Sequence, residues 1–417
     1  MTKSYSKRLI AGLLGLYIGQ GIPFGVAMFA VPGIMRSLGA SMAELGAFAL
    51  VMLPWALKIF WASQIDRRVL PRRRLGESHY LGWVRVMQVL GMVALATMFI
   101  IDPVQDFYLL VLILFLVTTF QSTQDIAVDA LAVQLAKQGD EQNLSANGVQ
   151  IGGFSAGMLI GGSGSLLVFE VLGWYGMIAY LMVLLLLAYA PFHLWQCLWQ
   201  QQLTVIESCH RASLSQAFKN PAGWQIIPVA FLFKFAGGMG EGLLTPLLVD
   251  QQTPLFWISA ITGTAMMTTM MLAAWLATRL GRIFDLTSLA TGSLLISAGC
   301  WAVLGSSLYF QSSPVVTASV MIVEWLFANI SCVAFFALFM RWCNPEQAGT
   351  DFSLLQCNEA LGGVMGMSLG AMLAQYFGFA NSFLIAAVAG VLFTLIILML
   401  LQRCFRTEQH DAQVMES

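Results

Sequence analysis

The stretch FYLLVLILFLVTTFQSTQDIAVDALAVQLA, residues 107–136, decides the fold of this chain. It is long and apolar enough to cross a lipid bilayer as a helix, yet it holds two carboxylates four residues apart, Asp125 and Asp129. Even mild insertion scales assign a cost of roughly 2.5–3.5 kcal/mol to one carboxylate at the bilayer centre, so we expect a span that keeps two to use them. Residues four apart share a helix face, and Gln121 and Gln124 extend this polar stripe. The stripe therefore faces protein or water and not lipid.

The composition belongs to a membrane protein with many spans. The chain has 417 residues, of which 58% are hydrophobic and only 10% are charged, and this balance excludes a water-soluble globule. Counting apolar segments of about 20 residues predicts twelve membrane-spanning helices and an all-α fold. The predicted spans are residues 9–32, 42–63, 81–101, 107–136, 145–168 and 174–195, and then 222–249, 255–277, 287–307, 315–341, 352–374 and 381–401.

The longest polar connector lies between the sixth and seventh predicted spans. It divides the chain into a six-helix bundle at residues 1–195, a cytoplasmic linker at 196–221, and a second six-helix bundle with a short cytoplasmic tail at 222–417. Two repeated bundles of this kind are typical of the major facilitator class of secondary transporters, in which the substrate site lies between the halves near the bilayer midplane. A channel or a rhodopsin-like receptor does not need this division.

The positive charges predict the orientation of the chain. If both termini are cytoplasmic, the inside segments hold 16 of the 20 Lys and Arg residues, and the outside loops hold only Arg36. An excess of Lys and Arg on cytoplasmic loops sets the orientation of membrane proteins, so we expect both ends inside. The basic N-terminal head is not expected to be a signal peptide, because the apolar segment after it is longer than a signal core and lacks a clear cleavage site.

Several classes of function lack their signatures in this sequence. There is no phosphate-cradling loop, no Ser-His-Asp arrangement and no metal-binding helix motif, so we expect neither an enzyme nor an ATP-driven pump, and no cofactor or resident metal. The seven cysteines include no pair in an outside loop, which argues against a disulfide framework. We expect a functional monomer in the lipid bilayer with no nucleic-acid partner.

Polar side chains gather in the first, fourth, seventh and tenth spans, which line the central cavity in this architecture. The residues that we expect to line the substrate cavity are Tyr17, Gln20, Gln121, Gln124, Lys234 and Asn329. The groups that we expect to carry protons or form ion pairs are Asp125, Asp129, Lys58, Glu241, Glu324 and Glu359. A carboxylic acid in low dielectric takes up and releases protons near neutral pH, as a proton-coupled carrier requires.

Lys58 is the cation of the first half that most needs a partner. It lies in the second span at a depth similar to that of Asp129, if each helix rises 1.5 Å per residue. A buried ammonium group requires a counter-charge, so we expect an ion pair with Asp125 or Asp129. This pair has two interpretations, a static bridge between the second and fourth spans or a part in proton coupling.

The seventh span carries a second charged pair, Lys234 and Glu241, which are seven residues apart and share one helix face. The segment between them, Gly237-Gly238-Met239-Gly240, predicts a weakened or bent helix, and we expect it to be the moving element of the second half. Glycines spaced by four in the fifth and eleventh spans predict seams of close helix packing.

Two charged loops occupy equivalent places in the two halves. They resemble the loop signature of major facilitators, an acid-Arg pair followed by Gly-Arg-Arg, although the first lacks the glycine and the second has Thr278 in place of the acid. The resemblance implies a charged latch that favours one gate state, and orientation by positive charge alone is the alternative. The expected latch residues are Asp66, Arg67, Arg279 and Arg282, beside the cluster Arg72-Arg73-Arg74.

Two short motifs carry a closer resemblance. The segments LPWALK at 53–58 and QDIAVDA at 124–130 are similar to the AmpG-like, muropeptide-permease branch of the major facilitators. The opening segment YIGQGIPFG at 17–25 and the length of the chain resemble more the inner-membrane siderophore permeases associated with rhizobactin, pyochelin and yersiniabactin. This resemblance implies proton-driven import of a ferric siderophore or related metal chelate across the bacterial inner membrane. A muropeptide permease, an exporter of siderophores or drugs, and a membrane sensor without transport are the alternatives.

Overall fold

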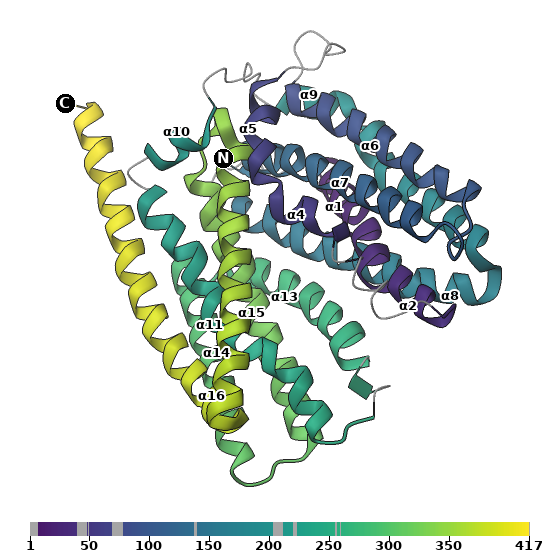
Figure 1. The fold of residues 1–417 in the computed structure, drawn as a ribbon. Helices are drawn as coiled ribbons and strands as arrows, with labels where there is room; N and C mark the ends of the chain where they lie inside the picture. The colour runs from purple at the N-terminus through teal and green to yellow at the C-terminus, as the bar shows by residue number, and fades with distance from the viewer. Residues whose placement is uncertain are drawn as a thin grey trace. The chain divides into compact units, whose positions relative to one another are not determined.

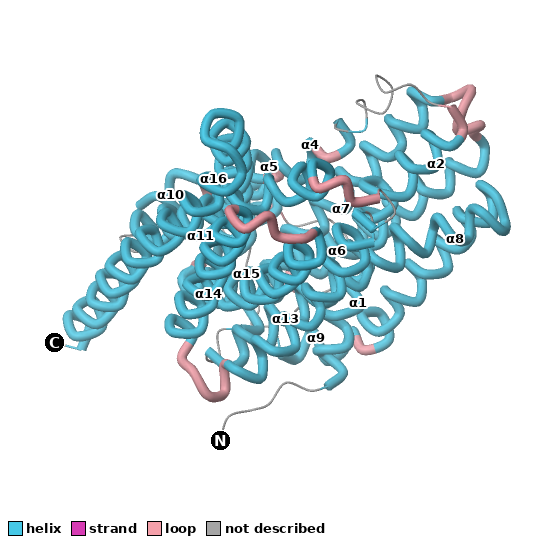
Figure 2. The backbone as a smooth tube through the Cα atoms, turned by 90° about the horizontal axis from the view of Figure 1, so that it is seen from below, coloured by secondary structure: helices cyan, strands magenta, loops and turns pink. Residues whose placement is uncertain are grey.

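The computed structural model describes residues 7–39, 48, 50–68, 78–136, 140–202, 212–219, 223–254, 257, 258 and 260–416. Throughout these residues the regular structure is helical, and no strand occurs among them (Figure 2). The predicted all-α class is therefore confirmed for this part of the chain. The cluster Arg72-Arg73-Arg74 lies outside the described residues.

The chain divides into two compact units, each of which contains one short segment from the other half of the sequence. Unit 1 holds Met1–Gln138, Val149–Ser213 and Cys343–Ser353, and unit 2 holds Gly139–Gly148, Leu214–Trp342 and Leu354–Ser417. The main division falls between Ser213 and Leu214, inside the expected linker.

The helices are labelled in Figure 1. Those of the first half are α1 (Lys7–Gly25), η1 (Val26–Ala30), α2 (Val31–Ser37), α4 (Leu53–Leu57), α5 (Ile59–Arg67), α6 (His79–Thr97), η2 (Met98–Ile100), α7 (Phe107–Ala136), α8 (Asp140–Leu194) and α9 (Gln196–Gln202). Those of the second half are α10 (Leu214–Lys219), α11 (Gly223–Asp250), η3 (Ala260–Ala265), α13 (Met266–Leu280), α14 (Leu286–Leu308), α15 (Pro314–Trp342), η4 (Pro345–Gln347) and α16 (Ala348–Glu416).

Eight helices in the described residues are long and apolar enough to cross a membrane, where the sequence predicts twelve spans. Two of the eight are far longer than a bilayer requires, with 50 residues in Ser145–Leu194 and 61 in Pro345–Phe405. Each is interrupted by a glycine in the left-handed region of backbone space, Gly173 with φ 69° and Gly378 with φ 76°. Glycine adopts this conformation without the steric cost that a Cβ adds, so the chain leaves one helix and enters the next within a single residue.

The second predicted span is only partly covered by the described residues. There it consists of two short helices, α4 and α5, with Lys58 between them in a turn whose backbone angles remain helical. Many large apolar side chains on the outer faces of the helices are exposed, including Val89, Val93, Leu186 and Leu187. In a membrane protein such surfaces meet lipid, where their exposure carries no hydrophobic penalty.

Glycines hold pairs of helices at backbone contact in both units, as the glycine spacing predicted. In unit 1, a Cβ added to Gly157 of α8 would lie 2.3 Å from the Ile18 carbonyl oxygen of α1. In unit 2, a Cβ added to Gly366 of α16 would lie 2.1 Å from the Phe235 carbonyl oxygen of α11. Because real side chains cannot approach a backbone oxygen so closely, only glycine permits these seams. The same seam recurs at the same place in the two halves, which supports an internal repeat.

The expected bend at Gly237–Gly240 is absent, because α11 remains a regular helix through this segment. The glycines serve packing there instead. A Cβ on Gly238 would lie 2.5 Å from the Gly363 carbonyl oxygen, and one on Gly240 would lie 2.5 Å from the Trp301 ring. Close contact on two sides stabilises the helix against the flexibility that glycine brings.

We expect Gly366→Ala to destabilise unit 2, because the new methyl group meets the Phe235 carbonyl and overpacking of this kind costs about 1–3 kcal/mol. Gly292→Ala on α14 is the matched control, since nothing lies within 4 Å of its added Cβ. Alanine also gains roughly 1 kcal/mol of helix propensity over glycine. Thermal unfolding in detergent should give a lower midpoint for Gly366→Ala and an unchanged or higher one for Gly292→Ala. Equal midpoints for the two variants would contradict the seam.

Candidate functional site

Lys58 and Asp125 form a buried ion pair in unit 1. The Lys58 ammonium group donates to Asp125 Oδ2, and the two side chains are only 4% and 5% exposed. The sequence predicted an ion pair of Lys58 with Asp125 or Asp129, and the structure contains the pair with Asp125. The ammonium also lies 5.5 Å from the centre of the Trp55 ring, within the range of a cation–π contact. This pair joins the α4–α5 junction to the middle of α7.

Asp129, one turn further along α7, is held by hydrogen bonds from two other helices. The Tyr17 hydroxyl of α1 and the Gln150 amide of α8 each donate to Asp129 Oδ1 at 2.9 Å. Asp129 is fully buried. Hydrogen bonds of this kind compensate part of the cost of removing a carboxylate from water. Tyr17 was among the expected site residues, but Gln150 was not. Gln150 lies on the same face of α8 as the glycine seam, and this position could have identified it.

A third polar contact follows from Pro23 in α1. Proline has no N–H, so the carbonyl four residues earlier, that of Gly19, loses its helical donor. The Tyr189 hydroxyl of α8 donates to this carbonyl at 3.3 Å, and the Gln121 amide donates to the Tyr189 hydroxyl at 3.2 Å. Tyr189 was missed by the sequence analysis, because it is a single tyrosine in an otherwise apolar span.

Asp125 and Asp129 do not open into water, so the stripe that was expected to face protein or water faces protein here. Asp125 is 4% exposed and Asp129 is fully buried. The charged and polar groups described above take the place of solvent, and they all belong to unit 1. Proton exchange at this site therefore requires an opening of the closed arrangement.

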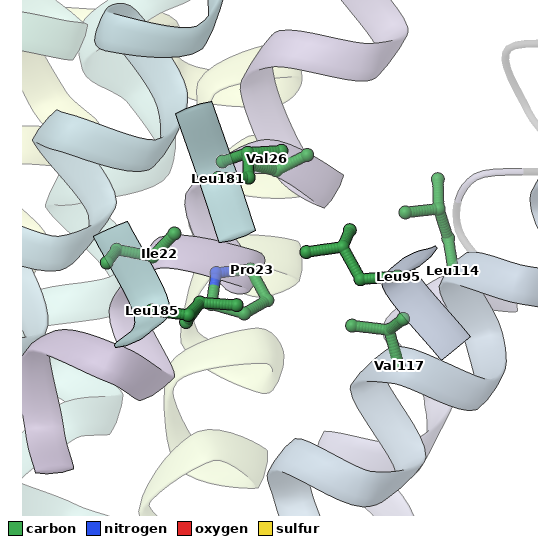
Figure 3. Close-up of a pocket in the computed structure, with 8 residues that line it drawn as sticks. All are labelled: Ile22, Pro23, Val26, Leu95, Leu114, Val117, Leu181 and Leu185. Atoms are coloured by element: carbon green, nitrogen blue, oxygen red, sulfur yellow. The ribbon is translucent and has the colours of Figure 1, made fainter. Parts of the chain in front are cut away.

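A pocket near this cluster lies on another face of α1 and is entirely apolar (Figure 3). Its volume is about 240 Å³, including the open space at its mouth. The lining residues are Ile22, Pro23, Val26, Leu95, Leu114, Val117, Leu181 and Leu185. At 100° per residue, Ile22 and Val26 point away from Tyr17 and Gln20, so the pocket and the polar cluster are separate. With no hydrogen-bonding side chain, it has no means of orienting a polar solute.

Unit 2 contains a second ion pair, between residues of one helix. The Lys234 ammonium donates to Glu241 Oε1 at 3.0 Å and to Oε2 at 3.3 Å, and the two side chains are 29% and 17% exposed. Glu359 of α16 adds negative charge close to Lys234. This site is more open than the Lys58–Asp125 pair.

The remaining expected residues of unit 2 have separate surroundings. Glu324 is fully buried in α15 and accepts a hydrogen bond from the Ser297 hydroxyl at 2.5 Å. The Asn329 amide donates to the Trp325 carbonyl of its own helix at 2.7 Å. Within the described residues, no contact joins Asn329 to the charged groups. Ser297, the hydrogen-bond donor to Glu324, was not among the residues expected from the sequence.

Asp66 lies beyond the second predicted span and caps the start of α16. Its carboxylate accepts hydrogen bonds from the Thr350 backbone N–H at 2.7 Å, the Thr350 hydroxyl at 2.5 Å and the Tyr80 hydroxyl at 2.6 Å. All three residues belong to unit 1, because Thr350 lies in its Cys343–Ser353 segment. A helix N-terminus carries partial positive charge and unsatisfied N–H groups, which favour a carboxylate at this point.

The other three latch residues differ from Asp66. Arg67 is exposed and donates through Nε to the Ala212 carbonyl. Arg279 is exposed and lies 5.4 Å from the Trp275 ring of its own helix, and Arg282 is exposed as well. At the place equivalent to Asp66, a Cβ on Gly148 would lie 2.5 Å from the Thr278 side chain. The two loops are therefore equivalent in position, but only the first has a buried carboxylate.

Comparisons with known proteins find similarity to transporters. Residues 9–170 match the family model described as acetyl-coenzyme A transporter 1. The putative transporter AmpG 3 of Rickettsia prowazekii is 24% identical over 93% of this chain and 95% of its own length. The anhydromuropeptide permease of Escherichia coli K12 is 24% identical over 96% of this chain and 81% of its own length.

Solved structures share the fold over nearly the whole chain. A bacterial homologue of the iron transporter ferroportin has a TM-score of 0.70 at 15% identity, covering 95% of this chain and 98% of that one. The fucose:proton symporter of Escherichia coli, a major facilitator superfamily transporter, has a TM-score of 0.67 at 13% identity, covering 94% and 98%. The chain has the major facilitator fold, and its sequence is similar to those of AmpG-named proteins.

These relatives favour the resemblance to muropeptide permeases over the resemblance to siderophore permeases. The Rickettsia protein carries an AmpG name and the Escherichia coli protein a muropeptide name, and neither is described as a siderophore permease. Chain length was one reason to favour the siderophore group, yet AmpG 3 is matched over 95% of its own length. A chain of this length is therefore not peculiar to siderophore permeases, and the muropeptide alternative fits the relatives better.

We expect Asp66→Asn to change how stability depends on pH. Burial raises the pKa of the Asp66 carboxyl above its ordinary value, while hydrogen bonds from Thr350 and Tyr80 act in the opposite direction. The folded protein therefore keeps this proton at a pH where the unfolded chain has lost it. The wild-type free energy of unfolding accordingly falls as pH rises between the two pKa values, and Asp66→Asn removes that fall.

Denaturant unfolding across the acidic range measures this dependence. Thr350→Val serves as the companion variant, because it removes one hydroxyl donor and leaves the titrating carboxyl in place. It should lower stability by about 1–3 kcal/mol while keeping a pH dependence. Parallel pH profiles for the wild type and Asp66→Asn would show that the burial of Asp66 is not coupled to folding.

Proposed function

We propose that this chain is a proton-coupled secondary transporter that carries a muropeptide-type solute into the bacterial cytoplasm. The observation that carries the proposal is the buried Lys58–Asp125 pair in a chain with the major facilitator fold. A buried ion pair is costly to form and contributes little net stability compared with apolar residues of similar size. Its retention in a membrane-spanning unit is more easily explained by a role in the transport cycle.

The chemistry of the pair suggests how a proton and a solute are coupled. Protonation of Asp125 neutralises the carboxylate and removes the attraction that holds the Lys58 ammonium. The released ammonium is then available for an anionic group of the solute, such as the carboxylates that peptides carry. Loss of the proton restores the pair and displaces that group. Tyr17 and Gln150 keep Asp129 in place during these steps.

The relatives support the choice of solute. A muropeptide combines sugar hydroxyl, amide and carboxylate groups, and the Escherichia coli relative is named for permeation of such molecules. We further propose twelve spans, with α8 and α16 each crossing twice, and both termini in the cytoplasm of a bacterial inner membrane. Asp66 at the start of α16 is the latch that favours one state of the gate. Four charged groups of the second half respond to the state of this gate: Lys234, Glu241, Glu359 and the buried Glu324.

A static bridge is the competing role for Lys58 and Asp125, and paired variants distinguish the two. Lys58→Met alone leaves Asp125 buried without its cation, which should cost about 3–5 kcal/mol of stability. The double variant Lys58→Met/Asp125→Asn should recover most of that stability. We expect it to lose gradient-driven accumulation and to exchange solute weakly, because it lacks both the titrating carboxylate and the ammonium that binds the solute. Asp250→Asn, an exposed carboxylate, is the control and should accumulate solute normally.

The measurements are counterflow and gradient-driven uptake of labelled anhydromuropeptide in the same vesicles. Full gradient-driven accumulation by the double variant would assign the pair to structure alone. Uptake of a labelled ferric siderophore, with no uptake of the muropeptide, would overturn the proposed solute and favour a siderophore permease.

A further inference from the structure

Three aromatic rings form a cluster beside the ion pair of unit 1. Phe24 of α1, Trp55 of α4 and Phe154 of α8 have ring centres 5.1, 5.5 and 5.8 Å apart, and every pair meets edge to face. This packing orients the rings without stacking their faces on one another. All three side chains are half-buried, so the cluster is neither a closed core nor a scattered set of lipid contacts.

The cluster contains a hydrogen-bond donor that the protein does not satisfy. The indole N–H of Trp55 is buried and has no acceptor in the described residues. One turn before Phe24 on the same helix, Gln20 is fully buried, and neither its amide nitrogen nor its amide oxygen has a partner there. Buried polar groups in native proteins are almost always paired with protein, water or ligand. Two such groups beside one cluster indicate a polar partner.

The backbone holds these groups in a fixed layer. A Cβ on Gly21 would lie 2.1 Å from the Phe154 carbonyl oxygen, so α1 and α8 are in backbone contact at the cluster. Lys58 follows Trp55 by one helical turn, and its ammonium lies 5.5 Å from the Trp55 ring. The Trp55 ring thus connects the cluster to the Lys58–Asp125 pair. The apolar pocket of Figure 3 does not include any of the three rings.

We propose that Phe24, Trp55 and Phe154 form a sugar-binding subsite that receives a pyranose ring of the transported solute. This inference rests on the proposed function, and it names the part of the solute that these residues recognise. One face of a pyranose presents C–H groups with partial positive charge, which are attracted to the negative face of an aromatic ring. The Trp55 N–H donates to a sugar hydroxyl or acetamido oxygen, and the Gln20 amide pairs with a neighbouring polar group.

The subsite and the ion pair would bind different parts of one solute. Lys58 meets an anionic group once Asp125 is protonated, and the rings hold the neutral sugar. A short distance between the two sites is required for one solute to reach both. Rigid rings give specificity at low entropic cost, because the edge-to-face packing already orients them before the solute arrives.

Equilibrium binding to the purified full-length protein in detergent tests the subsite. The probes are the peptide-free disaccharide of an anhydromuropeptide and the stem peptide without sugar. Trp55→Phe keeps a ring and removes the donor, so it should weaken disaccharide binding roughly fivefold. Trp55→Leu removes both and should weaken it roughly 10–100-fold. Stem-peptide binding should not change. Trp61→Phe is the matched control, because the Trp61 indole N–H is satisfied by Thr123 within the protein.

The outcomes separate the subsite from the proposed function. If the wild type transports labelled anhydromuropeptide but both Trp55 variants bind the disaccharide as the wild type does, the subsite is wrong and the proposed function stands. If the variants lose stem-peptide binding and keep disaccharide binding, the rings recognise peptide, and the sugar assignment is overturned. A wild type that neither binds the disaccharide nor transports the muropeptide overturns both. Monodisperse elution and an unchanged unfolding midpoint for Trp55→Phe confirm that folding is intact.

Discussion

The burial of opposite charges inside a lipid-embedded unit is the constraint that organises this protein. Lys58 and Asp125 are each almost fully removed from solvent, so neither charge is tolerable without the other. Their pairing determines where the α4–α5 junction meets α7. Asp129 accepts hydrogen bonds from neutral donors of α1 and α8. The polar cluster is consequently closed, and its contacts connect α1, α7, α8 and the α4–α5 junction.

The glycine seams explain how the two halves resemble each other without sharing their chemistry. Gly157 and Gly366 place α8 against α1 and α16 against α11 at backbone contact. The seams preserve the backbone arrangement, while the side chains around them differ. The first half has a closed ion pair between helices, and the second has a more open pair within one helix. The two halves therefore share a backbone arrangement and differ in how their charges are paired.

Two short motifs and the whole-chain relatives point to one branch of transporters, whereas the opening segment and the chain length pointed to another. The LPWALK and QDIAVDA segments supply Trp55, Lys58, Asp125 and Asp129, which together make the closed site and one wall of the aromatic cluster. These motifs pointed to the AmpG branch, and the relatives agree. The siderophore group was favoured by the chain length and by the opening segment 17–25, which supplies Tyr17 to the closed site and Phe24 to the aromatic cluster.

The sequence by itself determined the helical class and several spans, since periodic apolar runs leave a membrane chain no other way to satisfy its backbone. α7 begins and ends where the sequence predicted, and Lys58 was expected to pair with an aspartate of that helix. Only the tertiary structure decided which aspartate it pairs with, and that Gln150, Tyr189, Ser297 and Thr350 complete the polar contacts. It also decided that Gly237–Gly240 packs as a regular helix and that the carboxylates are closed to water. The physical reason is that spacing along one helix determines which residues share a face, whereas hydrogen bonds, burial and backbone contact depend on which other helix meets that face.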